Sequence, residues 1–166
     1  MNIAIFPGSF DPITNGHIDL VRRFEPLFDK IIVGVGVNSQ KKCLFSLDQR
    51  IKWLNEVFEN DANVEVDSFE GLTVNFCKQK NAKYLIRGLR NASDFDYEKT
   101  ISQLNNIIGD DVETVFFISR PEFSHISSTI VREIIKGHGD ITKFVSAVTA
   151  QRIVERVEHI KKTKTS

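Results

Sequence analysis

The fold of this chain is decided by the segment Phe6-Pro7-Gly8-Ser9-Phe10-Asp11-Pro12-Ile13-Thr14-Asn15-Gly16-His17. A short apolar run, residues 2–6, leads into it, and a pattern with helical spacing begins at about Gly16. The segment therefore predicts a strand, a tight turn and a helix that carries His17 in its first turn. A helix N-terminus presents unpaired N–H groups and the positive end of the helix dipole, which suits a phosphate. Gly8 would let that phosphate approach the backbone closely.

Apolar runs alternate with helical patterns along the rest of the chain. The predicted strands are residues 2–6, 30–36, 63–67, 83–86 and 113–118. The predicted helices are residues 16–28, 46–59, 71–80, 93–108, 126–135 and 149–161. This alternation predicts an α/β fold of the Rossmann-like, doubly wound type: a mainly parallel, five-stranded sheet with helices on both faces. We expect a single domain over residues 1–166, with a frayed tail from about residue 161.

Two of these helices carry clear local signals. Ser46-Leu47-Asp48-Gln49 has the pattern of a capping box, and Ser93 is the expected N-cap of the helix at residues 93–108. In that second helix four apolar residues recur at helical spacing. We expect them on its core face: Tyr97, Ile101, Leu104 and Ile108.

The composition excludes several classes of protein. Twenty-two Lys and Arg balance 22 Asp and Glu, so the chain has no global basic footprint for nucleic acid. Two cysteines are too few for a disulfide framework, and no Cys/His cluster has zinc spacing. No apolar stretch is long enough to span a bilayer, and no secretory signal opens the chain. We therefore expect a cytoplasmic protein that binds neither nucleic acid nor membrane.

The motifs that are missing narrow the chemistry further. The chain has no G-x-x-x-x-G-K-[ST], no G-x-G-x-x-G after the first strand and no G-x-S-x-G. What remains is a set of cationic and hydroxyl side chains that follow predicted strands. Such groups gather at one edge of a parallel sheet and can neutralise charge on a phosphoryl group. They are Ser9, His17, Lys41, Arg87, Arg90, Ser127, Ser128 and Thr129.

Three stretches carry a resemblance to a known family. Residues 7–12 with Thr14-Asn15-Gly16-His17 resemble the first motif of the nucleotidylyltransferase superfamily, and Ile126-Ser127-Ser128-Thr129 resembles its second. Residues 87–98 (Arg-Gly-Leu-Arg-Asn-Ala-Ser-Asp-Phe-Asp-Tyr-Glu) resemble, more narrowly, the phosphopantetheine adenylyltransferases. The resemblance extends over nearly the whole chain, including Lys41-Lys42.

The resemblance implies reversible transfer of AMP from ATP to 4′-phosphopantetheine, giving dephospho-CoA and pyrophosphate in coenzyme A biosynthesis. The attack would be direct and in-line, without a covalent enzyme intermediate, and His17 would stabilise the transition state. The implied ATP-binding residues are Ser9, Phe10, His17, Gly88, Leu89, Arg90, Glu98, Phe123, Ser124, His125, Ile126, Ser127, Ser128 and Thr129. The implied phosphopantetheine-binding residues are Ser9, Lys41, Thr73 and Arg87.

The resemblance also implies the cofactor and the partners. Mg²⁺ would be carried by ATP, with no metal ligands from side chains. Dephospho-CoA or CoA would bind as product or feedback ligand, and the protein would be a homohexamer. Phe123 stands where related sequences often have tryptophan, which keeps an aromatic face for adenine.

Two alternative functions remain open at this point. The first is nicotinamide mononucleotide adenylyltransferase, because residues 126–129 followed by Arg132 suit that relative too; residues 87–98 and Asp11 argue against it. The second is a non-catalytic sensor of a nucleotide or CoA on the same fold. The hydroxyls of Ser127, Ser128 and Thr129 also have a purely structural explanation as helix caps, and both roles can hold together.

Overall fold

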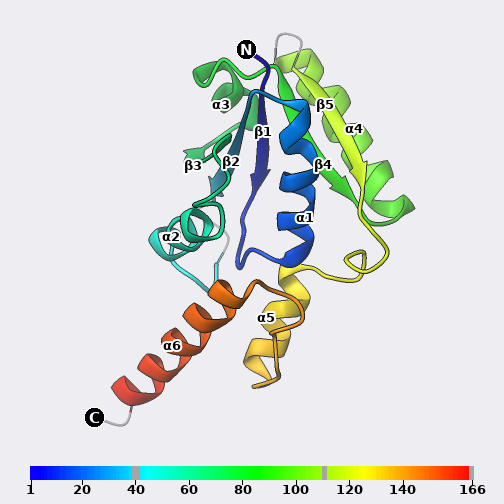
Figure 1. Ribbon diagram of the computed structural model, residues 1–166. Helices are drawn as coiled ribbons and strands as arrows, with labels where there is room; N and C mark the ends of the chain where they lie inside the picture. The colour runs from blue at the N-terminus through cyan, green and yellow to red at the C-terminus, as the bar shows by residue number, and fades with distance from the viewer. Residues whose placement is uncertain (39–41, 110–111, 165–166) are drawn as a thin grey trace.

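The computed structural model describes residues 1–38, 42–109 and 112–164 (Figure 1). Its centre is a sheet of five parallel strands in the order β3-β2-β1-β4-β5. The strands are β1 (Ile3–Gly8), β2 (Lys30–Val37), β3 (Val64–Glu70), β4 (Tyr84–Leu89) and β5 (Glu113–Ile118). The predicted doubly wound α/β fold is confirmed.

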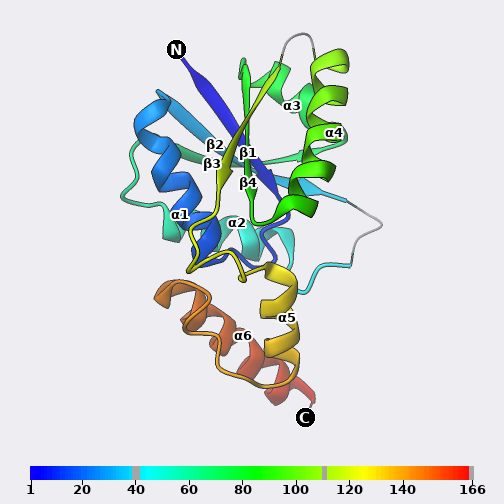
Figure 2. The same ribbon diagram turned by 90° about the vertical axis from the view of Figure 1, so that its right-hand side faces the viewer.

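Helices cover both faces of the sheet (Figure 2). One face carries α1 (Asn15–Phe24) and α2 (Leu47–Val57), and the other carries α3 (Thr73–Gln79) and α4 (Ala92–Ile108). Beyond the carboxyl ends of the strands lie α5 (Ser128–Lys136) and α6 (Ala147–Lys164) (Figures 1 and 2). None of the helices in the described part of the chain is long and apolar enough to cross a membrane.

The core follows from apolar strands that are buried on both faces. On the α1/α2 face, Ala4 and Val33 pack with Phe24 and Leu54, and all four are fully buried. The Phe24 ring stacks on Phe117 of β5, with ring centroids 3.8 Å apart. A second cluster, which includes Ile5, Ile32 and Phe76, fills the other face. This two-sided burial holds the carboxyl ends of the strands in a fixed arrangement.

A third cluster joins α5 and α6 to the main body. Trp53 of α2 and Phe45 pack with Val131 of α5 and with Val145 and Ile153, and all five side chains are buried. The α5 N-terminus is thereby held over the carboxyl edge of the sheet.

Some predicted boundaries were wrong. The first helix ends at Phe24, and residues 25–27 continue as a 3-10 turn containing Pro26, because proline lacks the N–H that an α-helix needs. Strand β4 runs three residues further than expected, so Arg87 and Gly88 lie in the strand and pair with β5. The N-cap of α4 is Asn91, whose side chain accepts the backbone N–H of Asp94 at 2.9 Å, and not Ser93.

The expected core face of α4 was also wrong. Tyr97, Leu104 and Ile108 are 66%, 51% and 48% exposed, and Ile101 is half-buried. The buried residue of this helix is Glu98. Because α4 lies at the β4–β5 end of the sheet, the sheet covers only one side of the helix. Tyr97 and Ile101 line a pocket beside the sheet, while Leu104 and Ile108 are largely exposed. By contrast, the capping box at Ser46 is confirmed, with the Gln49 N–H donating to Ser46 Oγ at 3.3 Å.

Candidate active site

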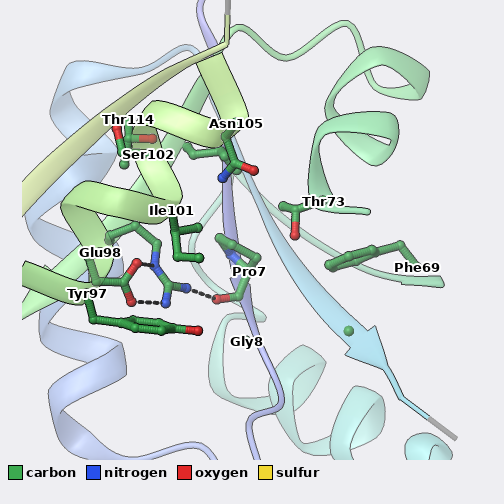
Figure 3. Close-up of a pocket in the computed structure, with 13 residues that line it drawn as sticks. Pro7, Gly8, Phe69, Thr73, Tyr97, Glu98, Ile101, Ser102, Asn105 and Thr114 are labelled. Atoms are coloured by element: carbon green, nitrogen blue, oxygen red, sulfur yellow. Dashed lines mark hydrogen bonds and ion pairs between the residues drawn. The ribbon is translucent and has the colours of Figure 1, made fainter. Parts of the chain in front are cut away.

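Two adjoining pockets open at the carboxyl edge of the sheet. The first, which we name the turn pocket, is bounded chiefly by Phe10, His17, Arg90, Phe123 and Ser127. The second, the α4 pocket, is bounded chiefly by Thr73, Arg87, Tyr97, Ile101 and Asn105 (Figure 3). They share Pro7, Gly8, Arg87 and Glu98. The chain order reverses between β1 and β4, and doubly wound folds bind ligands at that switch point.

The turn after β1 brings Phe10 against His17. Phe10 has a left-handed backbone with φ of 44°, which is uncommon for a residue with a side chain. Its ring is buried and packs edge-on against His17, with ring centroids 5.2 Å apart. A β-carbon at Gly8 would lie 2.9 Å from the Phe10 ring, so glycine at this position makes room for the ring.

His17 occupies the third position of α1, after the N-cap residue Thr14. The Thr14 N–H donates to Nδ1 of His17 at 3.1 Å, so Nδ1 carries a lone pair and the neutral ring holds its proton on Nε2. Burial, and then the positive charges of Arg90 and Arg87, lower the pKa of His17 from 6.5 to about 4. At neutral pH the ring is therefore an uncharged donor, through Nε2–H, in the wall of the turn pocket.

The two arginines near the end of β4 are each held by a carboxylate of α4. Arg87 donates from Nε to Glu98 at 2.8 Å and from Nη2 to the second Glu98 oxygen, and its Nη1 donates to the Pro7 carbonyl at 3.1 Å (Figure 3). Arg90 donates from Nε to Asp94 at 2.9 Å. These contacts with Arg90 keep the pKa of Asp94 below its usual range. Asp94 and Glu98 lie one helical turn apart, so one helix positions both guanidinium groups.

The hydroxyls at the start of α5 all make protein contacts. Ser127 is the N-cap, and its Oγ accepts the backbone N–H three residues on at 3.2 Å. Ser128 Oγ donates to the Pro12 carbonyl at 2.8 Å, and Thr129 Oγ1 accepts from Arg132 at 3.0 Å. The explanation as a helix cap is therefore confirmed for Ser127 and wrong for Ser128 and Thr129, which make other contacts. Ser127 and Ser128 also line the turn pocket.

Asp11 lines neither pocket, and its hydrogen bonds connect the turn to neighbouring segments. Its carboxylate is 2% exposed and accepts the backbone N–H groups of Leu44 at 2.8 Å and Phe45 at 2.9 Å. Its carbonyl accepts Nη1 of Arg132 at 2.7 Å. Sequence reasoning assigned Asp11 no bonding role, although its place between Phe10 and Pro12 in the turn could have suggested a structural one.

The α4 pocket combines apolar walls with a few polar groups. Tyr97 and Ile101 stand on one side and Phe69 and Thr73 on the other (Figure 3). The Thr114 hydroxyl, also in this wall, is buried and has no hydrogen-bond partner among the described residues. A pocket of this kind suits a ligand with both apolar and amide groups. Thr73 was predicted for the acceptor site, Tyr97 and Ile101 were predicted as core, and sequence reasoning gave Phe69 and Thr114 no role.

The predicted site residues fall into four groups. Those that line the turn pocket are Phe10, His17, Gly88, Arg90, Glu98, Phe123, Ile126, Ser127 and Ser128. Those that line neither pocket are Ser9, Leu89, Ser124, His125 and Thr129. Thr73 and Arg87, predicted for the acceptor, line the α4 pocket, and Lys41 lies outside the described residues.

No group of three or more His, Cys, Asp or Glu side chains within the described ranges is placed to hold a metal ion. Asp94 and Glu98, the acidic groups that line the turn pocket, are engaged by Arg90 and Arg87. This donor set fits a metal that is bound mainly by a ligand's own phosphates.

Comparison with known proteins agrees with this geometry. The family model described as cytidylyltransferase-like matches residues 5–134. A phosphopantetheine adenylyltransferase of Cytophaga hutchinsonii is 52% identical over 86% of this chain and 95% of its own length. One of Leptospira biflexa is 43% identical over 93% of this chain and 97% of its own.

Among solved structures, the fold is similar to a Plasmodium falciparum nicotinic acid mononucleotide adenylyltransferase complexed with NaAD. The TM-score is 0.73 at 18% identity, over 93% of this chain and 95% of that one. A putative nicotinate-nucleotide adenylyltransferase from Vibrio parahaemolyticus gives 0.72 at 15% identity, over 93% of each chain. At these identities the likeness concerns the fold.

Proposed function

The chain belongs to the cytidylyltransferase-like family and, within it, to the phosphopantetheine adenylyltransferases, and we propose that it transfers AMP from ATP to 4′-phosphopantetheine. The products are dephospho-CoA and pyrophosphate, on the route to coenzyme A. The observation that carries the proposal is the pair of adjoining pockets that share Arg87 at the switch point of the sheet. The turn pocket suits a nucleoside triphosphate, and the α4 pocket suits an acceptor that ends in a phosphate.

The nucleotide occupies the turn pocket and the acceptor occupies the α4 pocket. An oxygen of the acceptor's phosphate attacks the α-phosphorus of ATP, and a new P–O bond forms. The bond from the α-phosphorus to the oxygen bridging to the β-phosphate breaks, and pyrophosphate leaves with that electron pair. Because the attacking group is a phosphate anion, no general base is needed, and catalysis depends on alignment and charge stabilisation.

His17 acts as a stabiliser of the transition state and not as an acid–base group. Its Nε2–H donates to a non-bridging oxygen at the α-phosphorus, where negative charge builds up. A pKa of about 4 keeps the ring neutral, and the bond from Thr14 leaves Nε2 as its only donor. Arg87 holds the acceptor phosphate where the two pockets meet, and Arg90 serves the nucleotide.

The cofactor and the location complete the proposal. The ATP phosphates would hold Mg²⁺, which would supply charge neutralisation for the pyrophosphate that leaves. The cytoplasm is the compartment, since both cysteines are free thiols and Cys77 is buried.

The assembly is a homohexamer in this proposal. Support comes from α4, whose Tyr97, Leu104, Ile107 and Ile108 leave an apolar surface exposed on the single chain. Light scattering on a sizing column should give about six times the chain mass of 18.9 kDa. Ile107→Lys should lower that mass, and a monomer for the unmodified protein would contradict the assembly.

An acceptor assay tests the activity. Purified protein is incubated with ATP, Mg²⁺ and either 4′-phosphopantetheine or nicotinamide mononucleotide, and pyrophosphate and the adenylylated product are measured. We expect dephospho-CoA with the first acceptor only. Turnover with nicotinamide mononucleotide alone would refute the proposal, and binding of both substrates without pyrophosphate release would indicate a sensor.

A matched pair of variants tests the assignment of Arg87. Arg87→Lys loses the forked geometry, so the KM for phosphopantetheine should rise by about tenfold or more. Arg22→Lys is the control, since Arg22 lies outside both pockets on the exposed side of α1. An unchanged acceptor KM in Arg87→Lys would remove Arg87 from the acceptor site.

A further inference from the structure

We propose that Arg50, which lies outside both pockets, is a positioning residue that fixes the Ser9–Phe10 peptide and thereby the placement of Phe10 and His17. This inference rests on the proposed function for its kinetic test only.

Arg50 is a buried cation held by neutral partners. It projects from α2 and is 5% exposed. Its Nη1 donates to the Ser9 carbonyl at 2.6 Å and its Nε donates to the Phe45 carbonyl at 3.2 Å. Among the residues that the structure describes, no carboxylate forms an ion pair with it. Burying a guanidinium without a counter-charge is costly, so its presence favours a role that needs its two-pronged geometry.

The bond to Ser9 fixes the orientation of a backbone donor. The peptide unit is planar and trans, so the Ser9 C=O and the Phe10 N–H point in opposite directions. Arg50 holds the C=O on the α2 side and so directs the N–H the other way. No described group of the protein accepts this N–H, and Phe10 lines the turn pocket. The peptide is therefore set as a hydrogen-bond donor for an anion in that pocket.

The same bond stabilises an uncommon backbone conformation. The left-handed Phe10, with φ of 44°, costs free energy that its surroundings must offset. Two things hold it: Arg50 on the preceding carbonyl, and the buried ring packed between Phe6 and His17, at centroid distances of 5.5 Å and 5.2 Å. If the peptide rotates, the ring moves with it and the wall behind the imidazole of His17 is lost.

A second link explains why a variant of Arg50 should still fold. Asp11, two residues after Ser9, accepts the Phe45 N–H, while Arg50 donates to the Phe45 carbonyl. The turn and Phe45 are thus connected twice. Removal of the Arg50 link leaves the Asp11 link in place, so the turn is loosened and not released.

Arg50→Lys and Arg50→Gln test the proposal, with Arg152→Lys as the matched control. Arg152 also contacts α2, because its Nε donates to the Glu56 carboxylate at 2.9 Å, but it lines neither pocket. Assays run well below each variant's melting temperature. We expect kcat to fall by about 10- to 100-fold in both Arg50 variants, as for a small misplacement of reacting groups, and to stay unchanged in the control.

A spectroscopic readout separates positioning from general stability. In ¹⁵N-histidine NMR the unmodified protein should show His17 with Nε2 protonated and a pKa near 4. In Arg50→Lys the pKa of His17 should move towards 6.5 as the wall formed by Phe10 loosens. The charged groups that line the same pocket are Arg87, Arg90, Asp94 and Glu98, and the variant alters none of them.

Two results would overturn the role of Arg50. One is an Arg50→Lys variant that folds and has the same kcat and the same His17 resonance as the unmodified protein. The other is failure of both variants to fold even in the cold, which would make Arg50 a core residue. If the unmodified protein forms no dephospho-CoA, the proposed function fails, while the His17 resonance still decides the positioning role.

Discussion

Replacing His17 with alanine or glutamine separates its catalytic role from its structural one. In the proposed reaction the ring donates from Nε2 to the reacting phosphate. Through Nδ1 it accepts the Thr14 N–H at 3.1 Å, which gives α1 the geometry of a capping box with histidine in the place of Glu or Gln. Alanine removes both functions. Glutamine can restore the cap through its amide oxygen, but its amide does not reproduce the ring's position.

The expected magnitudes follow from those contacts. Loss of one preorganised donor at the developing charge should lower kcat by about 10²- to 10³-fold in His17→Ala, or about 2.7–4 kcal/mol. The free energy of unfolding should fall by about 2 kcal/mol, from the lost cap and the lost edge contact with Phe10. The His17→Gln variant should lose less than about 1 kcal/mol of stability. Its kcat should lie between that of the unmodified protein and that of His17→Ala.

Pyrophosphate release at saturating substrates measures kcat, urea unfolding measures stability, and calorimetry measures the ATP dissociation constant. The ATP dissociation constant should change far less than kcat, because the contact strengthens only in the transition state. A loss of ATP affinity equal to the loss in kcat/KM would refute the role of His17 as a transition-state stabiliser. Equal destabilisation by alanine and glutamine would refute the capping role.

Three other predictions concern pH, packing and thiol reactivity. With a folded pKa of about 4 against 6.5 unfolded, His17 should stay neutral from about pH 8 to 5 and so contribute no pH dependence to kcat in that range. The unfolded chain binds the proton first, so stability should decline as pH falls from 6.5 to about 4, and His17→Gln should remove that part of the decline. Gly88→Ala would place a β-carbon 2.3 Å from Leu20 Cδ1 and should cost about 1–3 kcal/mol in urea unfolding, partly recovered by Leu20→Val; no loss would mean that Leu20 can move aside. Burial raises the pKa of Cys77 to about 11, so a thiol reagent should titrate only Cys43 in the native protein and both thiols in denaturant. Rapid reaction of two thiols in the native protein would contradict the burial of Cys77.

The sequence predicted most of the fold because its strands are buried on both faces and read as apolar runs. It failed on α4 because a 3.6-residue period locates an apolar stripe without saying whether a sheet or solvent faces it. Tyr97, Leu104 and Ile108 therefore looked like core and are exposed. The N-cap error was local: Ser93 and Asn91 are both good caps, and only the backbone geometry distinguishes them.

The parts of the candidate site that consist of consecutive residues could be predicted from the sequence. The contacts between residues far apart in the sequence could not. The turn up to His17 and the start of α5 could be identified from consecutive residues. Glu98 meets Arg87 across 11 residues and Arg50 meets Ser9 across 41, and neither contact has a periodic signature. The contacts of every predicted residue with ATP or with the acceptor remain predictions, including those of Ser9, Thr129 and Lys41.

The two arginine–carboxylate pairs also bear on how the proposed substrates would reach the site. Arg87 with Glu98 and Arg90 with Asp94 are close to neutral as pairs, and His17 is uncharged at pH 7. These described groups therefore project little long-range attraction, and association with a polyanion should proceed at ordinary diffusive rates with a weak dependence on ionic strength. In the proposed function an anion would gain affinity here by taking over hydrogen bonds that the carboxylates already make. A multivalent phosphate with several oxygens can do this, whereas a small monovalent ion such as chloride gains little, and the pocket can thus select its ligands in a salt-rich medium.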